Sequence, residues 1–287
     1  MSDNHIDDET GVETTGHVWD GIRELNNPLP RWWLWTFYGC IAWGIGYTIA
    51  YPAWPMISGA TKGVLEFSTR GEVAKDIFAH EAKNADLVAA LNTADLMTLP
   101  PSDDLHRYAV ARGGSVFTAQ CSQCHGQGAA GAEGFPNLLD NDWLWGGDQE
   151  AIAYSIRHGI RNETDLDARY SEMPAYGDIL GNDEITSVVE YVFSLSATDY
   201  DAQLAATGAG VFMDNCAACH GDEAKGDRNI GAPNLADAIW LYGGDRETLT
   251  ETVTNARYGV MPAWGPRLSE EDVRAVAVYV HSLGGGE

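Results

Sequence analysis

Two copies of a cysteine-containing unit constrain this chain more than any other feature of its sequence. The centre of each copy is a five-residue motif, CSQCH at 121–125 and CAACH at 216–220, and the motifs lie 95 residues apart. The surrounding stretches repeat in three matched pairs: GGSVFTAQCSQCHG (113–126) with GAGVFMDNCAACHG (208–221), FPNLLDNDWLWGGD (135–148) with APNLADAIWLYGGD (232–245), and MPAYGDILGNDEITSVVEYVFSL (173–195) with MPAWGPRLSEEDVRAVAVYVHSL (261–283). Such internal similarity predicts two copies of one small domain of about 90 residues.

The C-x-x-C-H motif is typical of covalent haem attachment. Its two cysteines bond to the haem vinyl groups, and the adjacent histidine ligates the iron. The chain is therefore predicted to carry two haem c groups, attached through Cys121, Cys124, Cys216 and Cys219. His125 and His220 are the predicted proximal iron ligands.

Zinc and dithiol chemistry are the alternatives to haem. Four cysteines could form a zinc site, but this would leave the histidine of each motif unexplained. A thioredoxin-like redox pair needs a βαβ context, and no alternation of strands and helices is visible here. Haem attachment is the favoured interpretation.

Helix signals predict that both copies are all-helical. Asp148 and Asp245 each follow a Gly-Gly pair and open a run of apolar residues at helical spacing, as N-caps do. Ser269 and Asp272 form a variant of the capping box. The apolar residues after this box recur with a helical period: Val273, Val276, Val280 and Leu283. We expect a helix leading into each motif, one or two helices after Gly-Gly-Asp, and a final packing helix.

Each copy also offers a sixth ligand for the iron. Met173 and Met261 both precede a proline at matched positions of the repeat. An isolated methionine is usually core filler, but a thioether can ligate haem iron, where it favours the ferrous state and raises the reduction potential. The repeat favours ligation of each copy's own haem, without excluding the neighbour's.

Three other features of the repeat have less certain roles. His158 stands where the second copy has Tyr258, and is either a packing residue or a rival axial ligand. Arg157 and Arg257 occupy matched R-H-G and R-Y-G sequences, where a guanidinium could pair with a haem propionate or lie exposed at a helix end. The first copy carries a charged insertion at 161–172, predicted to be a surface loop that shapes a docking face or only fills space.

The segment at 32–54 is predicted to be a transmembrane helix. It has no charged residue and would be about 34 Å long as a helix, enough to cross a bilayer, with tryptophan and tyrosine towards its ends. A buried soluble helix is the alternative. The segment lacks a cleavage site and is expected to be an uncleaved anchor, within which Cys40 is a packing residue. Flanking positive charges do not fix its orientation. Because haem is attached outside the bacterial cytoplasmic membrane, we expect the haem domains in the periplasm.

The predicted architecture is mainly α, with one N-terminal transmembrane helix followed by two tandem cytochrome c-like domains. The predicted segments are a cytoplasmic acidic arm (1–31), the transmembrane helix (32–54), a linker with a helix around 72–97 (55–104), and two cytochrome c domains (105–199 and 200–287).

The chain is strongly acidic, with a formal net charge of -25. This charge should repel nucleic acid and attract basic proteins, so a basic soluble cytochrome is a natural electron donor. Solubility alone is the alternative explanation.

The chain resembles the dihaem subunit III of cbb3-type cytochrome c oxidases, the CcoP or FixP family, over essentially its whole length. The acidic arm, the NPLPRWW sequence at 27–33 and the two haem motifs with their Met-Pro pairs carry the resemblance. It implies a non-catalytic subunit that takes electrons from a periplasmic or membrane-bound cytochrome c. It passes them to a monohaem subunit and then to the haem-copper catalytic subunit, where oxygen becomes water and protons are pumped. It also implies that Met173 and Met261 are the distal ligands.

Two other functions compete with this interpretation. A dihaem carrier could serve another membrane complex, such as a dehydrogenase or a nitric oxide reductase, but the N-terminal arm favours the oxidase. A dihaem peroxidase generally needs one haem with a displaceable ligand, and the matched methionines argue against it.

Overall fold

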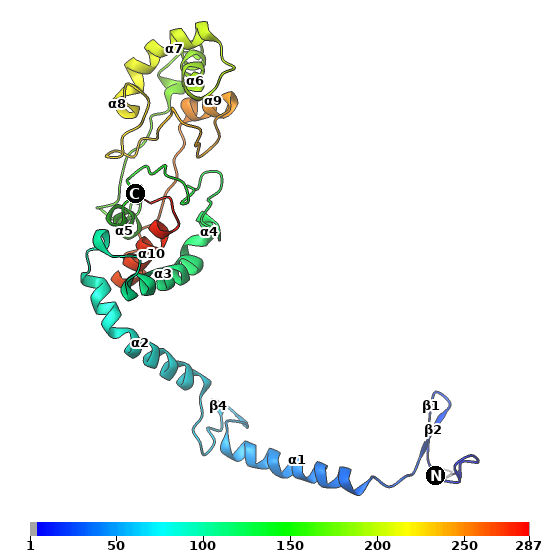
Figure 1. Cartoon of the computed structure of the whole chain (residues 1–287). Helices are drawn as coiled ribbons and strands as arrows, with labels where there is room; N and C mark the ends of the chain where they lie inside the picture. Colours follow the sequence, from blue (N-terminus) through cyan, green and yellow to red (C-terminus); the bar gives the residue numbers. More distant parts are fainter. Residues whose placement is uncertain (1–4, 287) are drawn as a thin grey trace. The chain divides into compact units, whose positions relative to one another are not determined.

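The computed structural model describes residues 5–286 and divides into two compact units, residues 1–83 and 84–287. The N-terminal elements are β1 (Thr14–Trp19), β2 (Ile22–Leu25), α1 (Arg31–Ala50), β3 (Pro55–Met56), β4 (Gly59–Ala60) and α2 (Thr69–Thr93). The elements that follow are η1 (Leu96–Thr98), α3 (Asp104–Val116), η2 (Phe117–Cys121), α4 (Ser122–His125), α5 (Gln149–His158), η3 (Tyr176–Asp178), α6 (Asn182–Ser196), α7 (Ala202–Asn215), α8 (Ala217–His220), α9 (Arg246–Asn255) and α10 (Glu270–Ser282) (Figure 1).

The acidic arm contains a β-hairpin, for which there was no sequence-based expectation. β1 and β2 are antiparallel, with Trp19 opposite Ile22. Asp20 and Gly21 form the turn, and both have positive φ angles, 49° and 86°. A two-residue turn of this kind matches the twist of the paired strands, and Asp-Gly is among its favoured sequences.

Helix α1 covers most of the predicted transmembrane segment. It carries no charged residue after Arg31 and ends at Ala50, because Tyr51 is extended before Pro52. Tryptophan, tyrosine and glycine recur along it and moderate its hydropathy. In the described part of the chain, no helix is both long and apolar enough to cross a membrane. The transmembrane helix predicted at 32–54 is therefore not confirmed.

The helix predicted around 72–97 is confirmed as α2 followed by the short η1. In the second unit, the end of α2 is tied to α10 by Arg274, whose Nε donates to the Leu91 carbonyl at 2.7 Å and whose Nη2 donates to the Ala94 carbonyl. The side chains of Leu91 and Leu96 are fully buried in the same core. Arg274 therefore satisfies backbone acceptors that the end of α2 would otherwise leave free.

Two helical bundles make up the second unit. In the first bundle, α10 packs against α3 and α5, and in the second bundle, α6 packs against α7 and α9. Figure 1 shows α10, in red, beside the green helices α3 and α5 although it closes the chain. The second bundle is thus continuous in sequence, whereas the first is completed by the C-terminal helix. The boundary predicted at 199/200 marks the end of a sequence repeat, and the packing crosses it.

A glycine permits the close helix crossing at the centre of each bundle. A Cβ atom on Gly113 of α3 would lie 2.1 Å from the Ala275 carbonyl oxygen of α10. A Cβ atom on Gly208 of α7 would lie 1.9 Å from the Ser187 carbonyl oxygen of α6. These positions are equivalent in the repeat, so each helix that leads into a motif crosses the final helix of the other copy.

The predicted helix starts are confirmed. Asp148, Asp245 and Ser269 each accept a hydrogen bond from the backbone N–H three residues later, at 2.8, 3.0 and 3.1 Å. These bonds satisfy donors that a helix leaves free at its first turn. In the described part of both copies, the regular structure is helical apart from isolated bridges.

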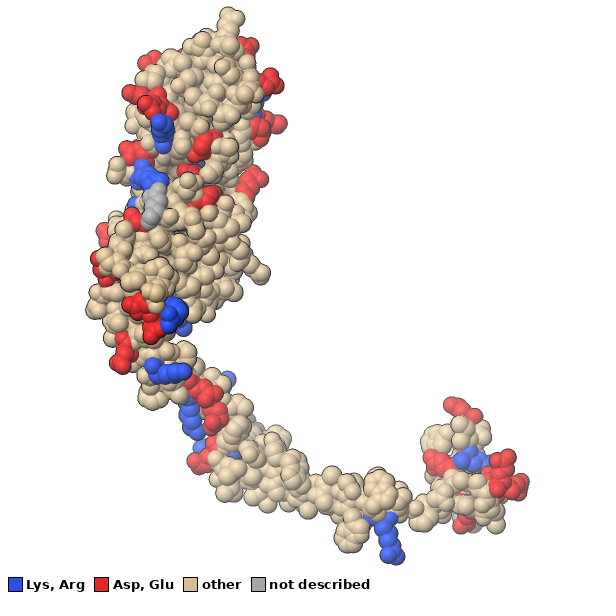
Figure 2. Space-filling model, viewed as in Figure 1, with Lys and Arg blue, Asp and Glu red and all other residues tan. Residues whose placement is uncertain are grey.

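Charge is distributed unevenly between surface and interior. Acidic side chains are spread over the visible face of the second unit (Figure 2). Several arginines of this unit are instead half-buried or buried, including Arg161, Arg169, Arg257 and Arg274. Because these arginine side chains are partly withdrawn from solvent, the surface of this unit is more acidic than its amino-acid composition alone would make it.

Candidate haem-binding sites

Each cysteine motif lies at the end of a long helix and is followed by a loop of the same shape. Ala129 and Ala224 occupy equivalent loop positions and both have positive φ angles, 61° and 58°. Their carbonyl oxygens accept hydrogen bonds from Leu138 and Leu235, at 2.8 and 2.7 Å. This return of the chain brings a Pro-Asn pair back over each motif histidine.

The two motif histidines are oriented by proline carbonyls. Nδ1 of His125 lies 3.2 Å from the Pro136 carbonyl oxygen, and Nδ1 of His220 lies 3.0 Å from that of Pro233. Since a carbonyl oxygen can only accept, Nδ1 carries the proton in both rings. Nε2 is then left as a free lone pair, which is the arrangement a metal-ligating histidine needs.

Burial controls the protonation of both motifs. It lowers the pKa of His125 and His220, which favours neutral imidazole. Burial, assisted by the neighbouring cysteine, raises the pKa of Cys121 and Cys216 to about 11, so both are thiols at neutral pH. Among the described residues, the four motif cysteines form no common cluster of metal ligands, and the zinc interpretation gains no support.

A cavity of about 650 Å³ opens at the second motif. Cys216, Cys219 and His220 line it, and so does Met173. Its apolar wall comes from both α6 and α7: Val188, Val192 and Phe212, with Leu249 and Val253 of α9. The size and apolar lining suit a large flat cofactor, and the histidine and methionine provide two candidate iron ligands.

Met261 belongs with the first motif. It packs against the first bundle's core together with Cys121. Its backbone pairs with Ile160 just after α5, in two hydrogen bonds of 3.0 Å. Trp264 N–H donates to the Ile156 carbonyl oxygen at 3.0 Å and fixes the next residues against the same helix.

The structure therefore brings the motifs and methionines together in crossed combinations. Met173 of the first copy lies with His220, and Met261 of the second copy lies with Cys121. The repeat favoured the opposite pairing, with each methionine beside its own motif. The crossing follows from the exchange of the final helices, because each methionine is only a few residues from the helix that follows it.

Arg157 does not face a haem site as a free cation. It forms an ion pair with Glu270 at the start of α10, with Nη2 and Oε1 2.5 Å apart. The proposed match of Arg157 with Arg257 is therefore not supported. The matched N-caps Asp148 and Asp245 align Arg157 with Thr254 instead.

Arg169 is the structural counterpart of Arg257. Arg169 Nη2 donates to the Ala151 carbonyl oxygen at 3.2 Å, and Arg257 Nη2 donates to that of Thr248, the equivalent residue, at 3.0 Å. The missed sequence signal is the triplet Ala-Arg-Tyr, which occurs at 168–170 and again at 256–258. It shows that the extra residues of the first copy lie before Ala168.

The insertion at 161–172 is a loop, as predicted, and Leu166 at its tip is fully exposed. Two residues of the loop are nevertheless held by hydrogen bonds. Asp165 lies 3.1 Å from His158 Nδ1, so His158 is engaged by the loop. Ser171 donates a hydrogen bond to the Ile230 carbonyl oxygen of the second bundle.

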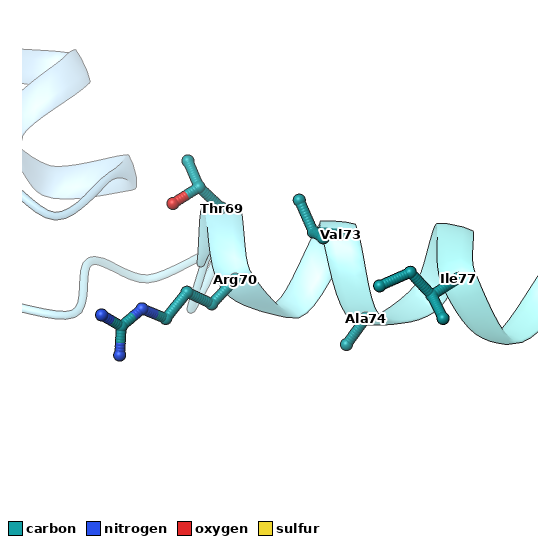
Figure 3. Close-up of a pocket in the computed structure, with 5 residues that line it drawn as sticks. All are labelled: Thr69, Arg70, Val73, Ala74 and Ile77. Carbon is teal, nitrogen blue, oxygen red and sulfur yellow. The ribbon is translucent and has the colours of Figure 1, made fainter. Parts of the chain in front are cut away.

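Another hollow lies along α2, in the N-terminal unit. The residues that line it all come from this one helix: Thr69, Arg70, Val73, Ala74 and Ile77 (Figure 3). It has no histidine, cysteine or carboxylate among these residues. We therefore do not assign it a cofactor.

Comparison with known proteins gives matches along nearly the whole chain. The family model described as the N-terminal domain of cytochrome oxidase-cbb3, FixP, matches residues 11–58. The model described as cytochrome c oxidase, cbb3-type, subunit III, matches residues 109–192 and 203–280. The CcoP subunit of Cereibacter sphaeroides is 59% identical over 96% of this chain and 95% of its own length. The FixP subunit of Sinorhizobium medicae is 52% identical, over 99% of this chain and 98% of its own.

Proposed function

We propose, from the premise that the chain belongs to the family of subunit III of cbb3-type cytochrome c oxidases, that it holds two covalent haem c groups with crossed axial ligands. The chain is an electron-transfer subunit of this oxidoreductase complex. The proposed attachment and ligand sets are Cys121, Cys124, His125 and Met261 for the first haem, and Cys216, Cys219, His220 and Met173 for the second.

One observation supports the crossed ligand sets above all others. Met173 and His220 line the same cavity, although they come from different copies of the repeat. The reciprocal position of Met261, against the core that contains Cys121, is the same arrangement in the first bundle. At both sites, therefore, the methionine comes from the other copy of the repeat than the cysteine motif, which supports the same crossed arrangement for both haems.

The residues of each site suit one-electron transfer. Bound haem c supplies an iron that exchanges a single electron. The proline carbonyls orient the proximal histidines, and burial favours their neutral form. The methionine thioethers would provide the second protein ligand of the iron and would favour its ferrous state. The apolar side chains around them exclude water. No acid, base or nucleophile is needed for this function.

The chain is proposed to accept electrons from a periplasmic or membrane-bound cytochrome c. As a subunit of a cbb3-type oxidase it associates with other oxidase subunits. We propose that it delivers electrons to the monohaem subunit and the haem-copper catalytic subunit, where oxygen is reduced to water and protons are pumped. The acidic surface in Figure 2 supports a basic donor, because opposite charge accelerates encounter.

We further propose that α1 lies in the inner membrane of a bacterium as a single pass, with the acidic arm in the cytoplasm and the two haem domains in the periplasm. No residue of α1 is buried, although many are large and apolar. Its 20 residues would extend about 30 Å, the thickness of a hydrocarbon core. Retention of the chain in membrane pellets after alkaline extraction, with release on deletion of residues 31–50, is the expected result.

Variants that keep only one haem test the crossed ligands. With Cys216→Ser and Cys219→Ser, only the first haem remains. Adding Met261→Ala should then abolish the near-infrared absorption band of methionine-ligated ferric haem. Adding Met173→Ala should leave that band in place.

The reciprocal background provides the control. With Cys121→Ser and Cys124→Ser, Met173→Ala should abolish the band of the second haem and Met261→Ala should not. If each methionine instead controlled the haem of its own copy, the crossed assignment would be wrong while both haems and the electron-transfer role remained.

A further inference from the structure

An arginine lies over an aromatic ring at the same place in each bundle. The Arg169 guanidinium is 5.4 Å from the centre of the Trp145 ring, and the Arg257 guanidinium is 4.6 Å from that of Tyr242. Trp145 and Tyr242 are equivalent in the repeat. Arg257 and Tyr242 line the cavity that contains His220, so this arginine–aromatic pair is part of a haem site.

The first pair has hydrogen-bond donors that lack acceptors. Within the described residues, neither Trp145 Nε1 nor Arg169 Nε has a hydrogen-bond partner, and both atoms are fully buried. In the second bundle, by contrast, Arg257 Nε donates to the Thr252 hydroxyl oxygen at 3.2 Å. A buried donor without a partner is destabilising, so two of them side by side require an explanation.

Arg169 is also a cation whose partners, in the described part of the chain, are a backbone carbonyl and aromatic rings, and not an anion. Burial lowers its pKa, and among the described residues no carboxylate forms an ion pair with it. The Trp145 ring packs closely against Gly231, where an added Cβ atom would lie 2.2 Å from it. A fixed indole N–H beside a guanidinium matches the acceptors of a carboxylate, which takes several charge-assisted hydrogen bonds.

We propose that Trp145 and Arg169 bind a propionate carboxylate of the haem attached to Cys121 and Cys124. This inference rests on the proposed haem sites and adds the residues that hold the edge of the first haem. From Asp148 to Ala168 is 20 residues, whereas from Asp245 to Ala256 is 11, yet Arg169 and Arg257 reach equivalent carbonyl oxygens in the two bundles.

The reduction potential of the first haem tests the proposal. In the full chain with Cys216→Ser and Cys219→Ser, Arg169→Gln removes a positive charge near the iron and stabilises the ferric state. The ferrous-to-ferric ratio at fixed potential should fall about tenfold, which is 59 mV for one electron. Trp145→Phe should lower the potential less, and both variants should alter the propionate bending mode in resonance Raman spectra.

Arg157→Gln is the matched control. Arg157 is another half-buried arginine of the first bundle, but Glu270 already pairs with it. Its substitution should leave the potential and the propionate mode unchanged. Arg169→Lys keeps the charge and should recover most of the potential, but not the propionate mode.

The near-infrared methionine band separates this inference from the ligand assignment. It should persist in every one of these arginine and tryptophan variants. A persistent band with an unchanged potential and propionate mode in Arg169→Gln would overturn the propionate subsite. An equal shift in Arg157→Gln would also overturn it, because a general charge effect would then be sufficient. Should Arg169→Gln fail to fold, Trp145→Phe and Arg169→Lys give the same decision through the propionate mode.

Discussion

The two bundles share one sequence unit but are assembled from the chain in different ways. The second bundle contains η3 to α9 without interruption, whereas the first needs α10 from the end of the chain. Their internal contacts are nevertheless equivalent. Phe117 meets Tyr279 with ring centres 5.5 Å apart, and the equivalent rings of Phe212 and Tyr191 are 5.1 Å apart. In both bundles, therefore, the final helix of one copy packs against the helix that leads into the motif of the other copy.

The bundles differ at one pair of equivalent positions, which is charged in the second bundle and uncharged in the first. Glu190 and Arg246 form a bidentate ion pair in the second bundle, with both bonds at 2.9 Å. The equivalent residues of the first bundle are Val278 and Gln149. Conversely, the first bundle has Asp142 where the second has Ile239. At each of these positions, one bundle can therefore be given the residue that already occurs at the equivalent position of the other.

Truncation before α10 should produce the largest difference in stability between the two bundles. We expect a chain that ends at Val260 to lose the first bundle and keep the second. The deletion removes the buried valines of α10: Val273, Val276, Val278 and Val280. Each contributes about 1.5 kcal/mol or more, and together they are comparable to the 5–15 kcal/mol that stabilises a domain. Limited proteolysis and the near-infrared methionine band measure the outcome.

Contiguous domains would give the reverse result. If residues 105–199 formed one domain by themselves, the same truncation would leave the first haem with its methionine and damage only the second. That outcome would contradict the exchange of helices.

Substitution of the glycines at the two helix crossings should have the next largest effect on stability. Gly113→Ala and Gly208→Ala should each destabilise their own bundle by about 2–3 kcal/mol, because the new methyl group meets a carbonyl oxygen of the crossing helix. Gly210→Ala is the control. It lies in the same helix as Gly208, but among the described residues no atom beyond its chain neighbours and its own helix backbone lies within 4 Å of the place of the new methyl group, so the substitution should stabilise slightly. Thermal unfolding of each variant provides the comparison.

The buried ion pair should have a smaller effect, confined to the second bundle. Arg246→Gln introduces the residue of the first copy and leaves the largely buried Glu190 carboxylate without its half-exposed cation, so it should destabilise the second bundle by less than the glycine substitutions do. Adding Glu190→Val should recover much of that loss. If the double variant were no more stable than Arg246→Gln, the carboxylate would not be the cause.

The ion pair between Glu190 and Arg246 also predicts that the stability of the second bundle depends on pH. Hydrogen bonds from Arg246, and then from the Asp201 N–H, hold the pKa of Glu190 below its ordinary value. The stabilisation is therefore present above the ordinary carboxyl pKa and is lost as pH falls through the lowered one. Unfolding measured from neutral pH downward should show this loss in the unmodified chain and less of it in Arg246→Gln.

Substitution of Asp142 should have the smallest effect on stability, and it should stabilise the protein where the preceding substitutions destabilise it. Burial, and then the charge of Asp237, raise its pKa to about 6. Its contribution is therefore most favourable below the ordinary carboxyl pKa and is lost as pH rises through about 6. Asp142→Asn should stabilise the first bundle by about 1 kcal/mol at pH 8 and have no such effect at pH 4. A gain that is equal at both pH values would show that the carboxyl group is not responsible.

Much of the fold could be predicted from local sequence. The helix starts at Asp148, Asp245 and Ser269 were identified correctly, because an N-cap depends on residues within one turn. The motif histidines were also recognised, and the structure adds the proline carbonyls that orient them. The β-hairpin was missed, although Asp20-Gly21 is a recognisable turn signal.

The register of the repeat was harder to predict. The short match between R-H-G and R-Y-G placed Arg157 opposite Arg257, whereas the structure places Arg169 there. Sequence similarity cannot locate extra residues reliably when two short matches compete. Arg169 becomes recognisable only when hydrogen bonds to equivalent carbonyls are compared.

By itself, the sequence determined the family and the helical class and predicted the haem chemistry, because the cysteine–histidine motifs and the helix caps act through residue type and short spacing. Only the tertiary structure decided which methionine lies at which motif. The two copies present nearly the same helix surfaces and the same glycine at the crossing, so local sequence is compatible with either pairing. The choice depends on how the intervening segments connect the bundles, which is a property of the whole chain.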